Sequence, residues 1–393
     1  MKVILKIKIR YARILLRDIF NISIDLFYMI YSKLSLIKEW EDKKPLLLLV
    51  ADNVSNRVEK ISFALGSNNM CVGLLYKNAK NLNKTNYSFS VKFRSAISLK
   101  RIINELQPST IHVFSSWDFN TAYYLIKRKV KYGKVVFDDY DVWSGIVNEN
   151  YLKYHYLPNQ LIKEQYCLKN ADGLCCRSLE FQVPKRMQVY QAQKRIFFPE
   201  YMINRESNGE LTKQERKKHT LVYAGNLNIN IIKIAEMISD IGWRLDVYPA
   251  HHSIKAFPNL PDNITIFETV DSDQLYEVLK HYRYGLIIPP DLAEGDSCIY
   301  SRNKRELAMT GKLFDYVDAG LKVVARDYSL ILCLLKRMNS LVELKGNDPL
   351  LSIRQTLTDI SDSVSEEVTQ SNFKNKYSLK ENGKRLIHFY SKL

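Results

Sequence analysis

A regular alternation of short apolar runs with longer amphipathic stretches most constrains how this chain can fold. Short apolar runs predict buried strands, and apolar residues spaced three or four apart predict helices. Strands that alternate with helices form parallel sheets covered by helices on both faces. In the first half of the chain, the pattern predicts strands at residues 46–50, 70–75, 111–114, 135–137 and 173–176, and helices at residues 58–65, 96–106, 121–127 and 161–171.

The same alternation begins again after residues 203–219, a polar and highly charged stretch that predicts a linker or a surface excursion. The predicted fold class is therefore α/β, with two Rossmann-like parallel-sheet domains. Parallel sheets of this kind bind ligands at the carboxyl ends of their strands, so two domains that face each other would share an interdomain cleft. The second series predicts strands at residues 221–223, 244–248, 264–267, 285–288 and 323–325, and helices at residues 231–241 and 273–281 and from Lys312 onward.

The N-terminal segment has a pattern of its own. Its apolar residues recur at helical spacing between basic ones, which is typical of an amphipathic helix at a membrane surface. A helix packed on the body of the protein would show the same pattern. No run of about 20 apolar residues predicts a transmembrane helix. The predicted parts of the chain are this N-terminal segment (residues 1–44), an N-terminal domain (45–202), the linker (203–219), a C-terminal domain (220–370), and a C-terminal helix (371–393) that can pack back on the N-terminal domain.

The charge of the chain favours anionic partners. There are 58 Lys and Arg residues against 42 Asp and Glu residues, so the net charge is 58 − 42 = +16. Such a charge suits phosphorylated substrates or an anionic membrane surface. Nucleic acid is not expected, because no recognisable nucleic-acid-binding module accompanies the charge. No signal peptide is evident, so we expect a cytoplasmic protein held peripherally on the inner face of the cell membrane.

The six cysteines predict neither a metal site nor a disulfide framework, because their spacing fits no zinc pattern in a chain of this length. Cys175 and Cys176 lie in an apolar run and are expected to be buried free thiols. Free thiols are typical of a reducing compartment.

The stretch that begins at Lys312 predicts a ligand-binding helix. Lys312, Asp315 and Tyr316 stand at positions i, i+3 and i+4, so they are expected to share one helix face. A helix N-terminus that carries a lysine attracts phosphate, and a carboxylate one turn later could hold sugar hydroxyls. Gly320 is expected to end the helix as a C-cap. The sequence thus predicts half of a binding site for a nucleotide diphosphate.

Three further residues are candidates for the same site. Gly225 follows a predicted strand and would let the backbone approach a phosphate. Asn226 stands next to it in the same loop. Arg302 belongs to a basic loop before Lys312 that could clamp phosphate.

Carboxylates of the N-terminal domain are candidates for the chemistry. Asp118 and Asp141 both follow predicted strand ends, where either could act as a general base for an acceptor hydroxyl or position it. Asp118 could equally be the N-cap of the following helix. Asp138 and Asp139 are expected to be loop carboxylates, although paired acids of this kind could bind a metal weakly.

Several segments resemble motifs of one family in the order expected for that family. The run from Lys312 to Val324 resembles the motif K-l-f-E-Y-x-x-x-G-x-P-V of bacterial GT-B glycosyltransferases, in the broad group 1 or family 4-like superfamily. Residues 222–227 resemble the y-x-G-n-l opening of the donor domain in that family. Further motifs are matched by residues 111–122, 135–143, 164–178 and 263–289.

The resemblance covers about Pro45 to Asp327 and implies a function. The N-terminal domain would bind an acceptor, and the C-terminal domain a nucleotide-diphosphate sugar, with Asp315 in place of the usual glutamate. The chain would be a glycosyltransferase of the hexosyl type with retaining chemistry. Its acceptor would be a hydroxyl on a glycan or lipid-linked molecule in bacterial surface polysaccharide or glycolipid assembly. The resemblance implies neither a metal ion nor a cofactor.

Two alternatives remain from the sequence. A sugar-nucleotide epimerase of the same architecture would act on the donor sugar without an acceptor, and it would need carboxylate pairs deep in the cleft. A catalytically silent scaffold of the same fold would bind a nucleotide sugar or recruit partner enzymes at the membrane.

Overall fold

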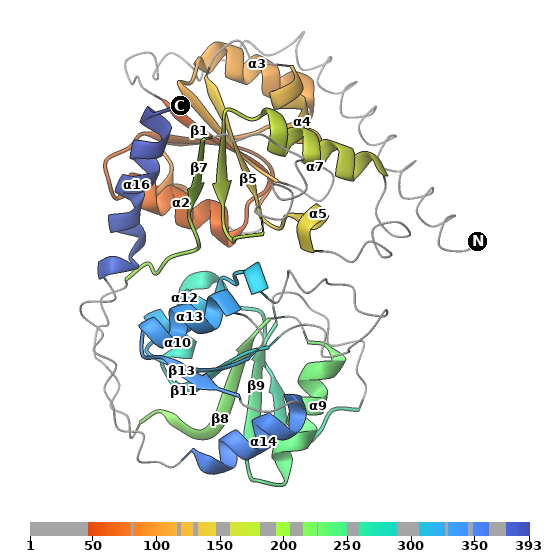
Figure 1. Cartoon of the computed structure of the whole chain (residues 1–393). Helices are drawn as coiled ribbons and strands as arrows, with labels where there is room; N and C mark the ends of the chain where they lie inside the picture. The colour runs from red at the N-terminus through yellow and green to blue at the C-terminus, as the bar shows by residue number, and fades with distance from the viewer. Residues whose placement is uncertain are drawn as a thin grey trace.

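In the computed structural model, the chain forms two parallel β-sheets, one in each half of the chain (Figure 1). The N-terminal segment (1–44) and three candidate site residues, Asp118, Asn226 and Arg302, lie outside the described residues. The structure describes residues 46–79, 82–115, 119–128, 133–146, 158–180, 194–204, 215–225, 227–249, 259–288, 306–326, 329–344, 349–360 and 375–393.

The first sheet has seven strands in the order β3-β2-β1-β4-β5-β6-β7, and every neighbouring pair is parallel. Its central strands are buried apolar runs, as the sequence predicted. The strands are β1 (Leu47–Asn53), β2 (Val72–Asn78), β3 (Phe89–Lys92), β4 (Thr110–Phe114), β5 (Lys134–Asp139), β6 (Gly173–Cys176) and β7 (Lys194–Phe197). The helices of this domain are α2 (Asn56–Gly66), α3 (Ala96–Leu106), α4 (Asn120–Lys127), α5 (Trp143–Ile146) and α7 (Pro158–Asn170), with a short 3₁₀ turn at Lys84–Asn86.

The second sheet has six strands in the order β10-β9-β8-β11-β12-β13, again all parallel. Its first strand along the chain, β8, begins at Lys217 and so includes the last three residues of the stretch predicted to be a linker (203–219). Those three residues have exposed side chains, so they lack the apolar run that marks a buried strand. The strands are β8 (Lys217–Ala224), β9 (Arg244–Tyr248), β10 (Ile264–Ile266), β11 (Tyr282–Ile287), β12 (Lys322–Ala325) and β13 (Leu341–Glu343). The helices are α9 (Ile229–Ser239), α10 (Ser272–Leu279), α12 (Lys312–Asp318), α13 (Ser329–Arg337) and α14 (Pro349–Asp359).

The C-terminal helix α16 (Leu379–Ser391) returns to the N-terminal domain and packs beside α2 (Figure 1). Its entry is fixed by a parallel bridge between Met202 and Ser378. Gly383 faces α2 so closely that a Cβ atom would overlap the backbone oxygen of Ala64. The absence of a side chain at Gly383 therefore lets the two helices approach at this point.

Helix α12 lies at the junction between the two domains (Figure 1). Lys60 of α2 forms an ion pair with Asp315 of α12, and the Leu179 N–H donates to the Leu307 carbonyl at 3.0 Å. Because α2 follows the carboxyl end of β1, this edge of the first sheet is directed toward the second domain. No helix among the described residues is both long and apolar enough to cross a membrane.

Candidate functional site

Helix α12 is ended by a glycine, as the sequence predicted. Gly320 has a left-handed backbone conformation with φ of 78°. Its N–H donates to the Val317 carbonyl at 3.0 Å, and the Leu321 N–H donates to the Tyr316 carbonyl at 2.9 Å. These two hydrogen bonds form a Schellman motif. The motif turns the chain directly from α12 into β12, so the helix is held at a defined position against the sheet.

Tyr316 fixes α12 to the sheet from the inside. Its side chain is fully buried, and its hydroxyl accepts a hydrogen bond from the Ala224 N–H at 2.8 Å. The ring fills the space above Gly285 of β11, where a Cβ atom would come within 2.7 Å of it. The sequence grouped Tyr316 with donor-binding side chains, but the structure places it in the core. It is a positioning residue, because its side chain has no exposed atom to offer a ligand.

Lys312 lies close to Gly225, the glycine that the sequence assigned to the same candidate site. The Lys312 ammonium lies 3.8 Å from the centre of the Tyr223 ring, a cation–π contact. A Cβ atom on Gly225 would come within 2.7 Å of Lys312 Nζ. The Gly225 N–H donates to the Tyr248 carbonyl at 2.9 Å, so this amide is already paired. Gly225 therefore provides room for the ammonium at the carboxyl end of β8.

Asp315 lies one turn from Lys312 on the same helix. Its side chain is 24% exposed, and its Oδ1 lies 2.7 Å from Nζ of Lys60 in the N-terminal domain. The structure thus brings a lysine ammonium and a partly exposed carboxylate to the domain junction on adjacent turns of α12. The sequence did not indicate Lys60, whose partner is 255 positions away.

Asp141, a candidate catalytic residue, is held by a buried arginine. Its Oδ1 lies 2.6 Å from the guanidinium of Arg177. That guanidinium also stacks on the Tyr140 ring at 3.7 Å and lies 3.7 Å from Glu200. The ion pair fixes the position of the Asp141 carboxylate just beyond the end of β5.

Asp138 and Asp139 are not loop carboxylates, which corrects the sequence prediction. They are the last two residues of β5, and both are buried. Successive side chains of a strand point to opposite faces of the sheet. Asp138 accordingly forms an ion pair with Arg57 of α2 on one face. On the other face, burial and the charge of Glu164 of α7 raise the pKa of Asp139. The sequence feature that could have predicted this arrangement is the pair of adjacent acids that directly follows the apolar run of the strand.

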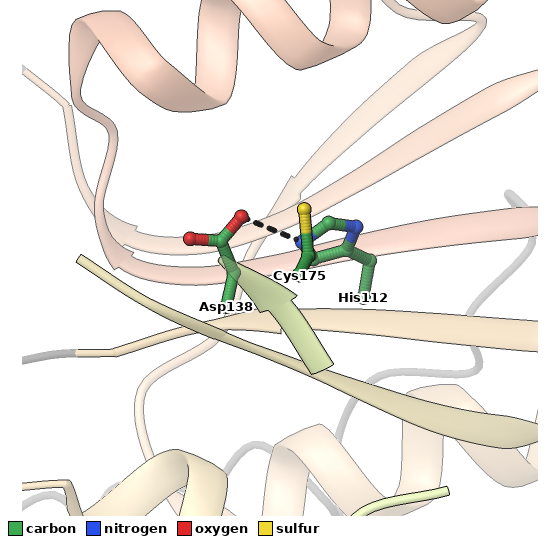
Figure 2. A group of neighbouring side chains, drawn as sticks. All are labelled: His112, Asp138 and Cys175. Atoms are coloured by element: carbon green, nitrogen blue, oxygen red, sulfur yellow. Dashed lines mark hydrogen bonds and ion pairs between the residues drawn. The ribbon is translucent and has the colours of Figure 1, made fainter. Parts of the chain in front are cut away.

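Asp138 lies at the centre of a buried network that includes His112 and Cys175 from the neighbouring strands (Figure 2). Arg57 donates from Nε and from its terminal nitrogen to the two Asp138 oxygens, each at 2.7 Å. Burial would raise the pKa of Asp138, but Arg57 and His112 outweigh it and lower this pKa to about 2. Both oxygens of Asp138 are thus occupied by donors. A metal ion would have to displace the guanidinium, so we assign this cluster a structural role.

The tautomer of His112 follows from its two partners. Its Nε2 lies 3.1 Å from an Asp138 oxygen, and its Nδ1 faces the Tyr390 hydroxyl. Burial lowers the pKa of His112, so the ring is neutral. An ionised carboxylate only accepts hydrogen bonds, so Nε2 carries the proton and Nδ1 accepts from Tyr390. Through Tyr390, this network ties α16 to the first sheet.

A second group of buried acids lies on the other face of β5. Glu164 accepts hydrogen bonds from the Trp143 and Ser144 N–H groups at the start of α5, at 2.6 and 2.9 Å, and burial raises its pKa to about 7. Burial and then the Glu164 charge raise the pKa of Asp139 well above its usual value, and nearby Ser115 offsets only part of this. Among the described residues, neither Asp139 oxygen has a partner in hydrogen-bonding geometry. Sequence reasoning did not single out this group.

The cysteines that the structure describes are free thiols, as expected from their spacing. Cys175 and Cys176 are buried, and burial raises the pKa of both thiols. Neither is therefore a candidate nucleophile.

Comparison with known proteins shows the fold of the chain. No protein-family model and no curated protein matches its sequence. Sucrose-phosphate synthase from Thermosynechococcus elongatus is similar in structure, with 11% identity, coverage of 89% of this chain and 99% of that chain, and a TM-score of 0.64. A glycosyltransferase from Rickettsia africae matches with 12% identity, 89% and 99% coverage and a TM-score of 0.59.

A UDP-N-acetylglucosamine 2-epimerase is also similar, with 10% identity, coverage of 88% of this chain and 95% of that chain, and a TM-score of 0.52. At such low identities these likenesses establish the fold alone. The chain has the GT-B architecture of two Rossmann-like domains, which confirms the fold predicted from the sequence.

Proposed function

We propose that this protein is a glycosyltransferase that moves a sugar from a nucleotide-diphosphate sugar to an acceptor hydroxyl. The observation that carries the proposal is the position of Lys312 and Asp315 on α12. The first places an ammonium beside Gly225 at the end of β8, and the second presents a partly exposed carboxylate at the domain junction. The carboxyl edge of a parallel sheet is where such folds bind nucleotides.

Each of these side chains has a distinct task in the proposed reaction. The Lys312 ammonium would meet the diphosphate and stabilise the negative charge that develops as the nucleoside diphosphate departs, which is the main electrostatic demand of sugar transfer. The Asp315 carboxylate would accept hydrogen bonds from the ribose hydroxyls. Asn226 and Arg302, predicted to contribute from neighbouring loops, remain proposed donor-binding residues.

The N-terminal domain would hold the acceptor. Asp141, fixed by Arg177, would orient the acceptor hydroxyl, and Asp118 remains a proposed general base. The family resemblance favours a retaining hexosyltransferase that acts on a glycan or lipid-linked acceptor in bacterial surface polysaccharide or glycolipid assembly. We propose no metal ion and no cofactor for the reaction.

The charge of the chain supports a place for the enzyme on the inner face of the cell membrane. A net charge of +16 and a basic N-terminal segment would attract an anionic lipid surface. Deletion of residues 1–38 is expected to release the protein from sedimenting anionic vesicles. Equal sedimentation of the truncated and full-length chains would refute this part of the proposal.

Thermal unfolding with a panel of UDP-, GDP-, ADP- and CMP-sugars tests the donor site. A donor that binds the folded state alone, at a hundred times its Kd, raises the free energy of unfolding by about 2.7 kcal/mol. Asp315→Ala and Lys312→Ala are expected to abolish most of the shift. Cys175→Ala, which alters a buried thiol of the N-terminal domain, is the matched control and should retain it. The proposal fails if no nucleotide sugar shifts the wild-type protein.

An epimerase of the same fold is the second candidate. The buried neighbours Asp139 and Glu164 favour it, because they form the kind of carboxylate pair that such an enzyme would need. Product analysis with the donor alone separates the two candidates. An epimerised nucleotide sugar without acceptor would support the epimerase, and donor binding without turnover on a broad acceptor set would support a silent scaffold.

A further inference from the structure

Lys60 is unusual because it is a buried lysine. It lies on α2, and its side chain is only 2% exposed. Lysines are almost never fully buried unless they are paired, because an unpaired ammonium in the interior is strongly unfavourable. Its partner is Asp315, at 2.7 Å, which belongs to the other domain. A buried charge of the N-terminal domain is thus compensated by a carboxylate of the proposed donor site.

The surroundings of Lys60 fix its ammonium at the domain junction. Glu200 and Asp318 are its further acidic neighbours, and Glu200 in turn lies against Gly311, directly before α12. Burial lowers the pKa of Lys60, but Asp315 and Glu200 outweigh it, so the ammonium stays charged. The ammonium therefore lies between acids from both domains, close to the start of α12.

The pairing engages only part of the Asp315 carboxylate. Oδ1 accepts from Lys60, and the described residues supply Oδ2 with no hydrogen bond. The side chain remains 24% exposed, against 2% for Lys60. Oδ1 is therefore held by the hydrogen bond from Lys60, while Oδ2 is available to a ligand. A carboxylate held in this way loses less rotamer freedom when it binds a ribose hydroxyl.

We propose that Lys60 is a positioning residue of the donor site, which holds Asp315 and makes donor affinity depend on the contact between the two domains. The inference rests on the proposed function. It adds a residue from the N-terminal domain to a site that the sequence assigned to the C-terminal domain alone. Lys60 acts through Asp315 and does not itself touch the donor.

Isothermal titration of the full-length protein with UDP, GDP, ADP and CDP tests this inference. Lys60→Met is expected to weaken the Kd of the bound nucleotide about tenfold, the loss typical of a charge-assisted hydrogen bond. Lys60→Gln keeps a donor of similar reach without the charge and should weaken it less. Lys77→Met is the matched control, because Lys77 forms its ion pair with Asp52, at 2.6 Å, inside the N-terminal domain. It should leave the Kd within about twofold.

A double variant separates positioning from direct contact. If Lys60 acts through Asp315, then Lys60→Met combined with Asp315→Asn should bind no more weakly than Asp315→Asn alone. Additive losses would mean that Lys60 touches the nucleotide itself and would overturn the inference. So would an unchanged or tighter Kd in the Lys60 variants, since tighter binding would mean that the ion pair competes with the donor.

Two results distinguish failure of the inference from failure of the proposed function. If the wild-type protein binds none of the four nucleotides, the donor site itself is wrong, and the inference falls with it. If the wild type binds and the Lys60 variants bind equally well, only the inference fails. Should Lys60→Met not fold, as judged by circular dichroism, the Kd of Lys60→Gln decides, and a value equal to that of wild type overturns the inference.

Discussion

The ion pair between Arg57 and Asp138 allows a direct test of the energetics of this interior. Its side chains are 1% and 0% exposed, and the guanidinium engages both carboxylate oxygens at 2.7 Å. A further guanidinium nitrogen donates to the Phe198 carbonyl at 3.0 Å. Arg57→Met removes the cation and leaves the carboxylate buried. The loss of one partner from such a pair costs about 3–5 kcal/mol of unfolding free energy.

The pH dependence of stability provides an independent estimate of the same interaction. The pKa of Asp138 is lowered from 3.8 to about 2. A carboxyl group whose pKa is lower in the folded protein stabilises the fold at pH values above its pKa in the unfolded chain. This stabilisation is lost as the pH falls through its pKa in the folded protein. The lowered pKa of Asp138 therefore contributes about 2 kcal/mol to the free energy of unfolding, and this contribution is lost between about pH 4 and pH 2. In Arg57→Met the remaining burial raises the Asp138 pKa, so the slope in this pH range should diminish or reverse.

Urea unfolding at pH 7 and across pH 2–5 measures both effects. Because two domains can unfold in separate steps, hydrogen exchange of the α2 and β5 amides reports the N-terminal domain alone. Arg101→Met is the control, since its pair with Glu105 is about one-third exposed on each side and should contribute less than about 1 kcal/mol. Arg57→Met with Asp138→Asn should recover part of the loss. The reasoning is refuted if Arg57→Met lowers the unfolding free energy no more than Arg101→Met does, or if the double variant recovers none of the loss.

Substitutions of Gly383 and Gly285 test close packing, and Gly66 is the control position. Gly383→Ala would press a methyl group onto the Ala64 carbonyl and is expected to destabilise the protein by about 1–3 kcal/mol; Gly66→Ala, which has open space, should be neutral or slightly stabilising in the same thermal unfolding assay. Gly285→Ala would place a methyl group 2.7 Å from the Tyr316 ring and displace α12, so it should weaken nucleotide binding in calorimetry as well as stability. Wild-type affinity in Gly285→Ala would contradict the role assigned to Tyr316.

The central strands could be predicted from the sequence because they are continuous apolar runs. Strand β4 coincides closely with its predicted range, and β1 begins within one residue of its predicted start and extends three residues beyond its predicted end. The two edge strands of the first sheet, β3 and β7, could not be predicted in this way. Strand β3 is only partly buried, and β7 begins with an exposed lysine followed by an arginine. An edge strand has a neighbour on one side only, so its side chains need not form an apolar run.

Part of the site was predictable for a related reason. Gly225 and Lys312 both stand at the carboxyl side of the second sheet, so the alternation of strands and helices already places them near each other. Tyr316 was predicted on the ligand-binding face of its helix but lies in the core. Consecutive helix residues are rotated by about 100° around the axis, and the i, i+3, i+4 spacing alone does not say which face of the helix packs on the sheet. Lys60 could not be predicted, since a lysine inside an amphipathic helix resembles any solvated one.

The two buried cations of α2 give this helix a particular place in the molecule. Arg57 and Lys60 stand one turn apart, yet the first pairs with Asp138 inside the N-terminal domain and the second with Asp315 across the junction. Helix α16 packs on the same helix, and its Tyr390 reaches His112 in the Asp138 network. The C-terminal helix, the core of the first domain and the proposed donor carboxylate are thereby joined through α2. A displacement of α2 would therefore alter the anchoring of Asp315 without any change in the C-terminal domain.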